Sequence, residues 1–217
     1  MSWKKRAFEN FKLYAVTDLQ SESVEILKKI EAAYRGGADI VQLRSKMLSD
    51  QFLLGLGLKI RKMATHYRKL FFVNDRPDLA ILTFADGIHL GQEDLSIRAV
   101  RGFAQRSGLP LWIGKSTHRL SQALAAVKEG ADYIGVGPIF ATPTKPDYPT
   151  TGPEFIRQIS GRIKIPYVAI GGINETNMDE VLRAGARRVA VVRAIWGADN
   201  VYRATKELRE KIENFSG

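Results

Sequence analysis

The sequence contains no cysteine among its 217 residues and has only three histidines. The first absence excludes disulfides, thiolate metal sites and cysteine nucleophiles, and it suits a protein of the cytoplasm. The three histidines, His66, His89 and His118, are too few to favour a histidine-rich zinc site. No apolar run approaches the roughly 18 residues of a membrane span. The charged start MSWKKRAFENF is not followed by the apolar stretch of a secretory signal, so we expect no membrane partner.

The chain also lacks Gly/Ser-rich linkers and low-complexity tracts, so we expect residues 1–217 to form a single domain. Its hydrophobic share of 45% is enough for a sizeable core. The net charge of +10 is compatible with nucleic acid, an anionic surface, phosphorylated substrates or a solvated basic exterior. Because the basic residues are scattered and no RNA-binding motif accompanies them, we expect no nucleic-acid partner.

A weak internal repeat is the most informative pattern. Short turns rich in Gly, Ala and Asp introduce apolar runs in GGADIVQLR, FADGIHLG, EGADYIGVG and AGARRVAVV. The matching positions, Asp39, Asp86, Asp132 and Arg187, are separated by 47, 46 and 55 residues. A βα unit takes about 25 residues, so each interval holds two units and the chain holds eight strands.

The apolar runs place these strands near 12–17, 40–46, 70–75, 87–91, 111–116, 133–139, 166–171 and 188–193. Helical patterns lie between them, and alternating strands and helices favour a parallel sheet. We predict an α/β fold, a compact (β/α)8 TIM barrel with a short N-terminal helical extension. An open doubly wound sheet is the alternative, but a repeat of equivalent units favours closure.

In such a barrel, the active site lies at the carboxyl ends of the strands. Strand two ends in Gln42-Leu43-Arg44-Ser45-Lys46, where alternation points Gln42, Arg44 and Lys46 into the barrel. Buried cations are costly unless they are paired. Local acids could neutralise them, but no acid lies within this strand, so we favour an anion site.

Two carboxylates follow the next two strands, Asp75 in VNDR and Asp94 in GQED. Each could simply cap the helix that follows it. Beside an Arg/Lys cluster, the two together indicate Mg²⁺, which binds through one or two carboxylates and the oxygens of a substrate phosphate.

Strand five ends in Lys115-Ser116-Thr117-His118. Ser116 is a candidate donor to a phosphate oxygen, although a hydroxyl at a strand end is also an ordinary helix cap. For His118, a site role and a cap-region role stay open. We interpret His89, inside strand four, as a hydrogen-bonded core histidine, and leave Lys115 unassigned.

The loop over 137–152 has prolines that exclude a regular helix, and Thr142, Thr144 and Lys145 supply donors. At the catalytic face, a loop of this length is typical of a lid, with a tolerated surface insertion as the alternative.

Strand seven leads into Gly171-Gly172, and strand eight ends at Val192-Arg193. Loops after these two strands commonly form a phosphate cradle in this fold. The sequence therefore predicts two anion sites, one for a diphosphate and one for a phosphorylated acceptor. That pairing indicates group transfer with loss of pyrophosphate.

The chain resembles the thiamine-phosphate synthase family, also called thiamine-phosphate pyrophosphorylase, from YAVTD (14–18) to VAVVRAI (189–195). The motifs that carry the resemblance are VQLRSK, VNDR, DGIHLGQEDL, GKSTH, GPIFATPTK and VAIGGI, in order and at strand ends. The resemblance implies a barrel that couples hydroxymethylpyrimidine diphosphate to hydroxyethylthiazole phosphate, giving thiamine phosphate and pyrophosphate with Mg²⁺. A thiazole tautomerase-like relative of the same fold is the alternative, although this chain keeps the diphosphate and metal residues that such relatives tend to lack.

The resemblance also assigns residues to roles. Those around the pyrimidine diphosphate are Gln42, Arg44, Lys46, Asn74, Ser116 and Lys145, with Arg44, Lys46, Ser116 and Lys145 catalytic. Asp75 and Asp94 correspond to magnesium ligands. Residues on the thiazole-phosphate side are Thr142, Thr144, Gly172, Val192 and Arg193.

The mechanism that the family implies is loose. The diphosphate leaves first, and the thiazole nitrogen captures the pyrimidine methylene cation, so no protein nucleophile is needed. The chain departs from the family at Arg193, where many members have serine. The oligomeric state stays open between a monomer and a homodimer.

Overall fold

Eight parallel strands close into a barrel in the computed structural model, which describes residues 2–23, 25–143 and 149–215. The strands pair in chain order, and β1 also pairs with β8 to close the ring. They are β1 Leu13–Val16, β2 Ile40–Leu43, β3 Leu70–Asn74, β4 Gly87–Leu90, β5 Trp112–Thr117, β6 Tyr133–Val136, β7 Tyr167–Ala169 and β8 Val189–Val191. The predicted barrel is confirmed, and each expected strand is present.

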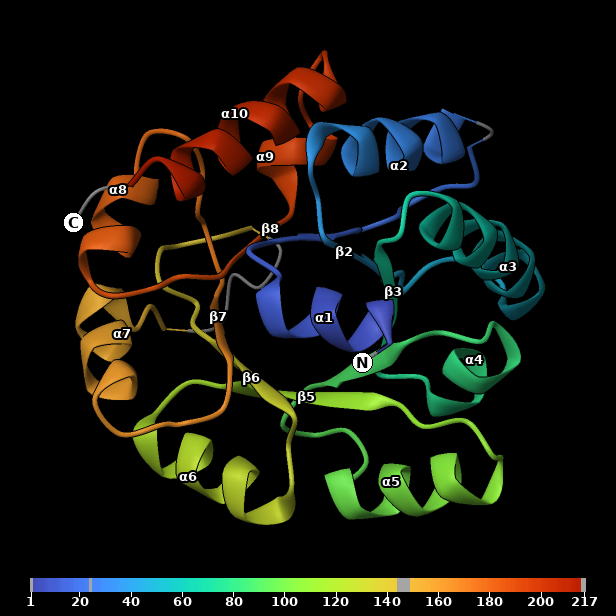
Figure 1. The fold of residues 1–217 in the computed structure, drawn as a ribbon, viewed down its shortest axis with the longest axis horizontal. Coiled ribbons are helices and arrows are strands. Elements are labelled where there is room, and N and C mark those ends of the chain that lie inside the picture. The colour runs from blue at the N-terminus through green and yellow to red at the C-terminus, as the bar shows by residue number, and fades with distance from the viewer. Residues whose placement is uncertain (1, 24, 144–148, 216–217) are drawn as a thin grey trace.

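Helices alternate with the strands and surround the ring, while α1 lies across its middle (Figure 1). They are α1 Trp3–Asn10, α2 Glu25–Gly36, α3 Asp50–His66, α4 Pro77–Leu82, α5 Ile97–Arg106, α6 Leu120–Glu129, α7 Gly152–Ser160, α8 Met178–Arg183, α9 Arg193–Trp196 and α10 Val201–Glu213. Within the described ranges, no helix is both long and apolar enough to span a membrane. The expected N-terminal helical extension is α1.

The apolar side chains form two cores, one between strands and outer helices and one inside the barrel. Helix α1 contributes Phe8 to the inner core, where its ring stacks on Trp112 with centroids 4.5 Å apart. Phe11, directly after α1, is 1% exposed. Helix α1 therefore fills the amino-terminal end of the barrel with packed rings, and the opposite mouth is left for chemistry.

Three repeat aspartates make the same two bonds at the amino-terminal rim. In each, the backbone N–H donates to a carbonyl of the preceding odd strand, and Oδ2 accepts from the N–H of that same residue. The pairs are Asp39 with Leu13, Asp86 with Phe71 and Asp132 with Ile113, at 2.7 to 3.2 Å. The repeat found in the sequence is therefore a repeated lock between neighbouring strands.

Each of these carboxylates also holds an arginine from an outer helix. The pairs are Asp39 with Arg209 of α10, Asp86 with Arg61 of α3 and Asp132 with Arg101 of α5. The fourth repeat has Arg187, which is exposed and has no side-chain acceptor. Three quarters of the barrel are thus joined to their helix layer by the same type of ion pair.

The buried lock gives a prediction about stability. The Asp86 side chain is 1% exposed and also pairs with Lys4 at 2.8 Å. Asp86→Asn leaves the buried Arg61 guanidinium without its carboxylate, so we expect the free energy of unfolding to fall by about 3 kcal/mol in urea titrations.

Glu154→Gln is the matched control, because the Glu154–Arg157 pair lies on the surface. It should change the free energy of unfolding by less than about 0.5 kcal/mol. An Asp86→Asn protein as stable as this control would contradict the role of the lock.

Candidate active site at the carboxyl ends of the strands

The end of β2 carries one buried cation. Arg44 is 8% exposed, and its guanidinium pairs with Asp18, which follows β1. The strand stops at Leu43, and Lys46 lies beyond it with an exposed side chain. The expectation that both cations are buried on one strand face is therefore wrong for Lys46. At Arg44 the neutralising acid comes from the neighbouring strand end, and the remaining guanidinium N–H groups can still serve a second acceptor.

Asp75 and Asp94 do not cap helices. Helix α4 has Arg76 at its N-cap, and α5 is capped by the Ser96 hydroxyl. Asp94 instead turns back on its own loop, where Oδ2 accepts from the Gly91 N–H at 2.6 Å. The capping interpretation is thereby excluded for both carboxylates.

The two carboxylates meet each other. Burial, together with a hydrogen bond and charge repulsion from Asp94, raises the pKa of Asp75 to about 7. Asn74 donates from Nδ2 to Asp75 Oδ2 at 2.5 Å, and the Asp75 N–H donates to the His89 carbonyl at 2.9 Å. Asp75 has φ 58°, a backbone conformation that is costly for a residue with a side chain. The loop thus brings two acids together, and no Lys or Arg of the described residues forms an ion pair with either of them.

A chain of polar groups crosses the barrel below this mouth. Gln42 Nε2 lies 2.6 Å from the Tyr14 hydroxyl, which lies 3.1 Å from the Tyr133 hydroxyl. His89 joins Tyr133 to Ser116, with 2.9 Å from Nδ1 to the Tyr133 hydroxyl and 2.9 Å from Nε2 to Ser116 Oγ. His89 is therefore a hydrogen-bonded histidine of the barrel interior, as predicted. Ser116 is tied to this interior rather than to a helix end.

His118 is bound at the mouth between β5 and β6. Its Nδ1 contacts the Gly137 carbonyl, and its backbone N–H donates to Gln122 Oε1 at 2.8 Å. The second bond satisfies an N–H at the start of α6. Both expected interpretations of His118 thus stay open, with the cap-region contact now visible.

The glycine pair after β7 is required by packing. Gly171 and Gly172 have φ 103° and 64°. A Cβ at Gly171 would lie 2.4 Å from Pro138 Cα, and one at Gly172 would lie 2.6 Å from the Ala141 carbonyl oxygen. The two loops therefore approach so closely that side chains at these positions would collide. Thr142, in the same β6 loop, is half-buried.

Two expected residues, Thr144 and Lys145, lie outside the described residues. The described remainder of 137–151 is irregular, as the prolines predicted. Lid closure stays a prediction.

Val192 and Arg193 lie at the turn from β8 into α9. Val192 is half-buried, whereas Arg193 is exposed. Arg193 lines a hollow of about 510 Å³ together with Asn174 of the β7 loop and Asp199. The positive charge of Arg193 is thus solvated in this structure, next to the loop that follows β7.

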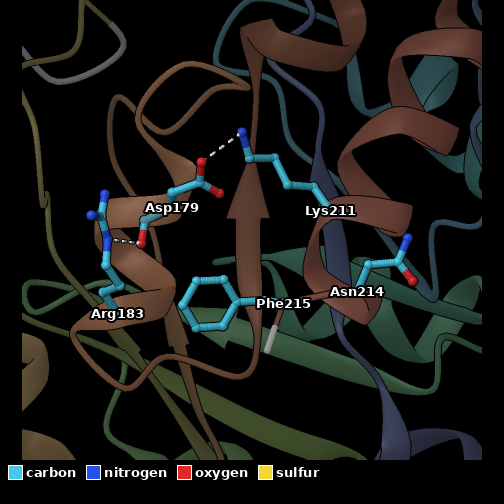
Figure 2. Close-up of a pocket in the computed structure, with 5 residues that line it drawn as sticks. All are labelled: Asp179, Arg183, Lys211, Asn214 and Phe215. Atoms are coloured by element: carbon cyan, nitrogen blue, oxygen red, sulfur yellow. Dashed lines mark hydrogen bonds and ion pairs between the residues drawn. The ribbon is translucent and has the colours of Figure 1, made fainter. Parts of the chain in front are cut away.

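A second hollow, of about 470 Å³, lies on the outside of the barrel between α8 and α10 (Figure 2). Its two cations are already engaged, because Lys211 pairs with Asp179 at 3.1 Å and Arg183 Nε donates to the Asp179 carbonyl. It is not part of the mouth that carries the predicted residues.

The sequence interpretation missed Asp18, Tyr14 and Tyr133. Asp18 was visible as an acid two residues after the end of β1, much as Asp75 directly follows β3. Tyr14 and Tyr133 stand at inward positions of their strands, so a polar group at the end of a large inward ring was the available signal.

Comparisons with known proteins agree with this architecture. The family model for thiamine monophosphate synthase matches residues 13–195. A thiamine-phosphate synthase of Thermus thermophilus is 46% identical over 187 residues, covering 86% of this chain and 88% of the relative. One from Pyrococcus abyssi is 43% identical over 209 residues, covering 96% and 98%.

A solved structure of thiamine phosphate pyrophosphorylase from Pyrococcus furiosus superposes with a TM-score of 0.86 at 40% identity, covering 95% of this chain and 98% of that one. These names favour the synthase over the tautomerase-like alternative. The chain belongs to the thiamine monophosphate synthase family and is a transferase of thiamine biosynthesis that forms thiamine phosphate.

Proposed function

We propose that the barrel mouth binds the two substrates, and that Asp75 and Asp94 there would hold the Mg²⁺ that serves the diphosphate. The observation that carries this proposal is the contact between Asp75 and Asp94 at the ends of neighbouring strands. The residues assigned to the pyrimidine diphosphate are Gln42, Arg44, Lys46, Asn74, Ser116 and Lys145. Those assigned to the thiazole phosphate are Thr142, Thr144, Gly172, Val192 and Arg193.

The two carboxylates fit Mg²⁺. The described residues contain no group of three or more His, Cys, Asp or Glu side chains that could form a complete cage. Mg²⁺ needs none, because it usually takes one or two carboxylates and completes its shell with water and substrate phosphate. The high pKa of Asp75 reflects two acids that share a half-buried space, which is the arrangement a cation relieves.

The reaction is a displacement at the pyrimidine methylene carbon. The bond from that carbon to the diphosphate oxygen breaks, and its electron pair leaves with the diphosphate. The thiazole nitrogen then donates its lone pair to the same carbon, so thiamine phosphate and pyrophosphate form without a protein nucleophile. When bound, Mg²⁺ supplies positive charge to the departing diphosphate.

The chain's own groups serve the leaving diphosphate in different ways. Arg44 keeps a buried guanidinium in place through Asp18. Lys46, exposed beyond β2, adds a charge from the solvent side. The family resemblance assigns a further positive charge to Lys145, which lies outside the described residues. Hydrogen-bond donors and cations that interact more strongly as negative charge develops on the leaving diphosphate lower the activation barrier to bond cleavage.

The direct test is an assay with the purified chain, both substrates and Mg²⁺, with thiamine phosphate measured as product. The proposed site predicts that product formation depends on added Mg²⁺ and releases one pyrophosphate per thiamine phosphate. Equal rates with Mg²⁺ and with a chelator would contradict it.

The metal assignment gives a second prediction. Asp75→Asn and Asp94→Asn should each raise the Mg²⁺ concentration for half-maximal rate at least about tenfold, because each removes a charged ligand. Glu93→Gln is the matched control, an exposed acid next to Asp94. Wild-type rates for both asparagine variants at limiting Mg²⁺ would rule the assignment out.

Arg193 gives a third prediction. We propose that it turns from the solvent toward the phosphate of the thiazole substrate. Arg193→Ser should then raise the KM for thiazole phosphate about tenfold, because a charge-assisted hydrogen bond is lost, and leave the KM for the pyrimidine diphosphate within about twofold. An unchanged or lower thiazole phosphate KM would mean that backbone groups alone hold the phosphate.

We also propose that the enzyme works in the cytoplasm, which the lack of cysteine favours, and that it forms a homodimer. Leu82 and Phe84, exposed by 56% and 57% around the end of α4, are apolar surface that a second copy could cover. Sedimentation of the purified chain at micromolar concentration measures the oligomeric state.

A further inference from the structure

The hydrogen bonds that link Gln42 to Ser116 inside the barrel all run in one donor-to-acceptor direction. Gln42 Nε2 is an amide nitrogen, so it donates to the Tyr14 oxygen. Tyr14 is 2% exposed, and its own O–H therefore needs an acceptor. In the described part of the chain, the contact that can accept it is the Tyr133 oxygen, 3.1 Å away.

The direction passes on through the histidine. Since the Tyr133 oxygen receives the Tyr14 proton, the Tyr133 O–H donates to His89 Nδ1 at 2.9 Å. His89 then carries its proton on Nε2, which donates to Ser116 Oγ at 2.9 Å. Because Ser116 Oγ accepts this proton, its own O–H is available to donate to another acceptor.

The opposite direction leaves a group unsatisfied. If Ser116 donated to His89, then His89 Nδ1–H would donate to Tyr133, and Tyr133 would donate to Tyr14. The buried Tyr14 oxygen would then receive two donors, and its own O–H would face an amide N–H. A buried donor without an acceptor costs roughly 1–3 kcal/mol, so the first direction prevails.

Two glycines on the neighbouring strands β5 and β6 leave space for these hydrogen-bonded side chains. A Cβ at Gly114 would lie 2.1 Å from Tyr133 Cζ and 2.6 Å from its hydroxyl oxygen. A Cβ at Gly135 would lie 3.1 Å from His89 Cε1. Two strand positions thus lack side chains where the tyrosine and the histidine need the space.

We propose that Tyr14, Tyr133 and His89 are positioning residues that fix the Ser116 hydroxyl as a hydrogen-bond donor to the departing diphosphate. The inference rests on the proposed site, which assigns Ser116 to that group. A serine hydroxyl can donate or accept, and an oxygen that gains negative charge is served only by a donor. The interior hydrogen bonds therefore fix the Ser116 hydroxyl as a donor before the substrate binds.

The first experiment measures the histidine tautomer. NMR of the protein labelled with ¹⁵N-histidine gives few signals because there are only three histidines, and His89→Gln identifies the one of interest. We expect His89 to be protonated on Nε2 and bare on Nδ1. A proton on Nδ1 would overturn the direction. In Tyr14→Phe, which removes the donor that sets the direction, the Nδ1-protonated form should become populated.

The second experiment is a double-mutant cycle on the synthase reaction. Tyr133→Phe keeps the ring and should lower kcat about fivefold to tenfold, with the KM for pyrimidine diphosphate within about twofold. In a Ser116→Ala background the same change should cost less than about twofold, because Tyr133 acts through Ser116. Tyr34→Phe is the matched control, since the buried Tyr34 hydroxyl donates to the Leu70 carbonyl and takes no part in the hydrogen bonds from Gln42 to Ser116.

The outcomes distinguish a failure of the positioning role from a failure of the site assignment. Additive losses for Tyr133→Phe and Ser116→Ala would show that Tyr133 does not act through the serine, and would overturn the positioning role alone. A Ser116→Ala enzyme with unchanged kcat would overturn the site assignment and the positioning role together.

Discussion

Three carboxylates at the amino-terminal rim, those of Asp39, Asp86 and Asp132, join β1, β3 and β5 each to the next strand. Each closes a two-bond ring with one strand residue and holds an arginine from the helix layer. The bonds fix the register of neighbouring strands, and the ion pairs fix the helices against them. A closed parallel barrel depends on such a register, because a slip of one residue exchanges the inward and outward faces.

The amino-terminal end of the barrel is held together by these bonds and filled by side chains, so the carboxyl-terminal end is the one available to bind substrates. Helix α1 and its aromatic neighbours fill the amino-terminal end, so polar groups inside the ring are reached from the opposite mouth. There the side chains are held at some cost: Asp75 has a left-handed backbone, two acids share one space, and Arg44 is buried beside Asp18. The stabilising locks and the proposed active site thus lie at opposite ends of the same eight strands.

The repeat predicted the number and order of the strands because equivalent units leave equivalent turns in the sequence. Strand ends were less predictable, and β2 stops at Leu43 although the alternating pattern continues to Lys46. Pairs made by barrel closure could not be predicted: Tyr14 and Tyr133 are 119 residues apart, and Arg44 meets an acid 26 residues earlier. The types of the mouth residues follow from the sequence, whereas their partners follow from the closed ring.

The central claim is that the Ser116 hydroxyl donates to the diphosphate while Asp75 and Asp94 hold the metal beside it. The most direct measurement is a crystal structure of the enzyme with thiamine phosphate, pyrophosphate and Mg²⁺ bound. The account predicts a pyrophosphate oxygen within hydrogen-bond distance of Ser116 Oγ, His89 Nε2 still on that serine, and the cation on both carboxylates. A pyrophosphate bound away from Ser116, or a cation that contacts neither aspartate, would contradict it.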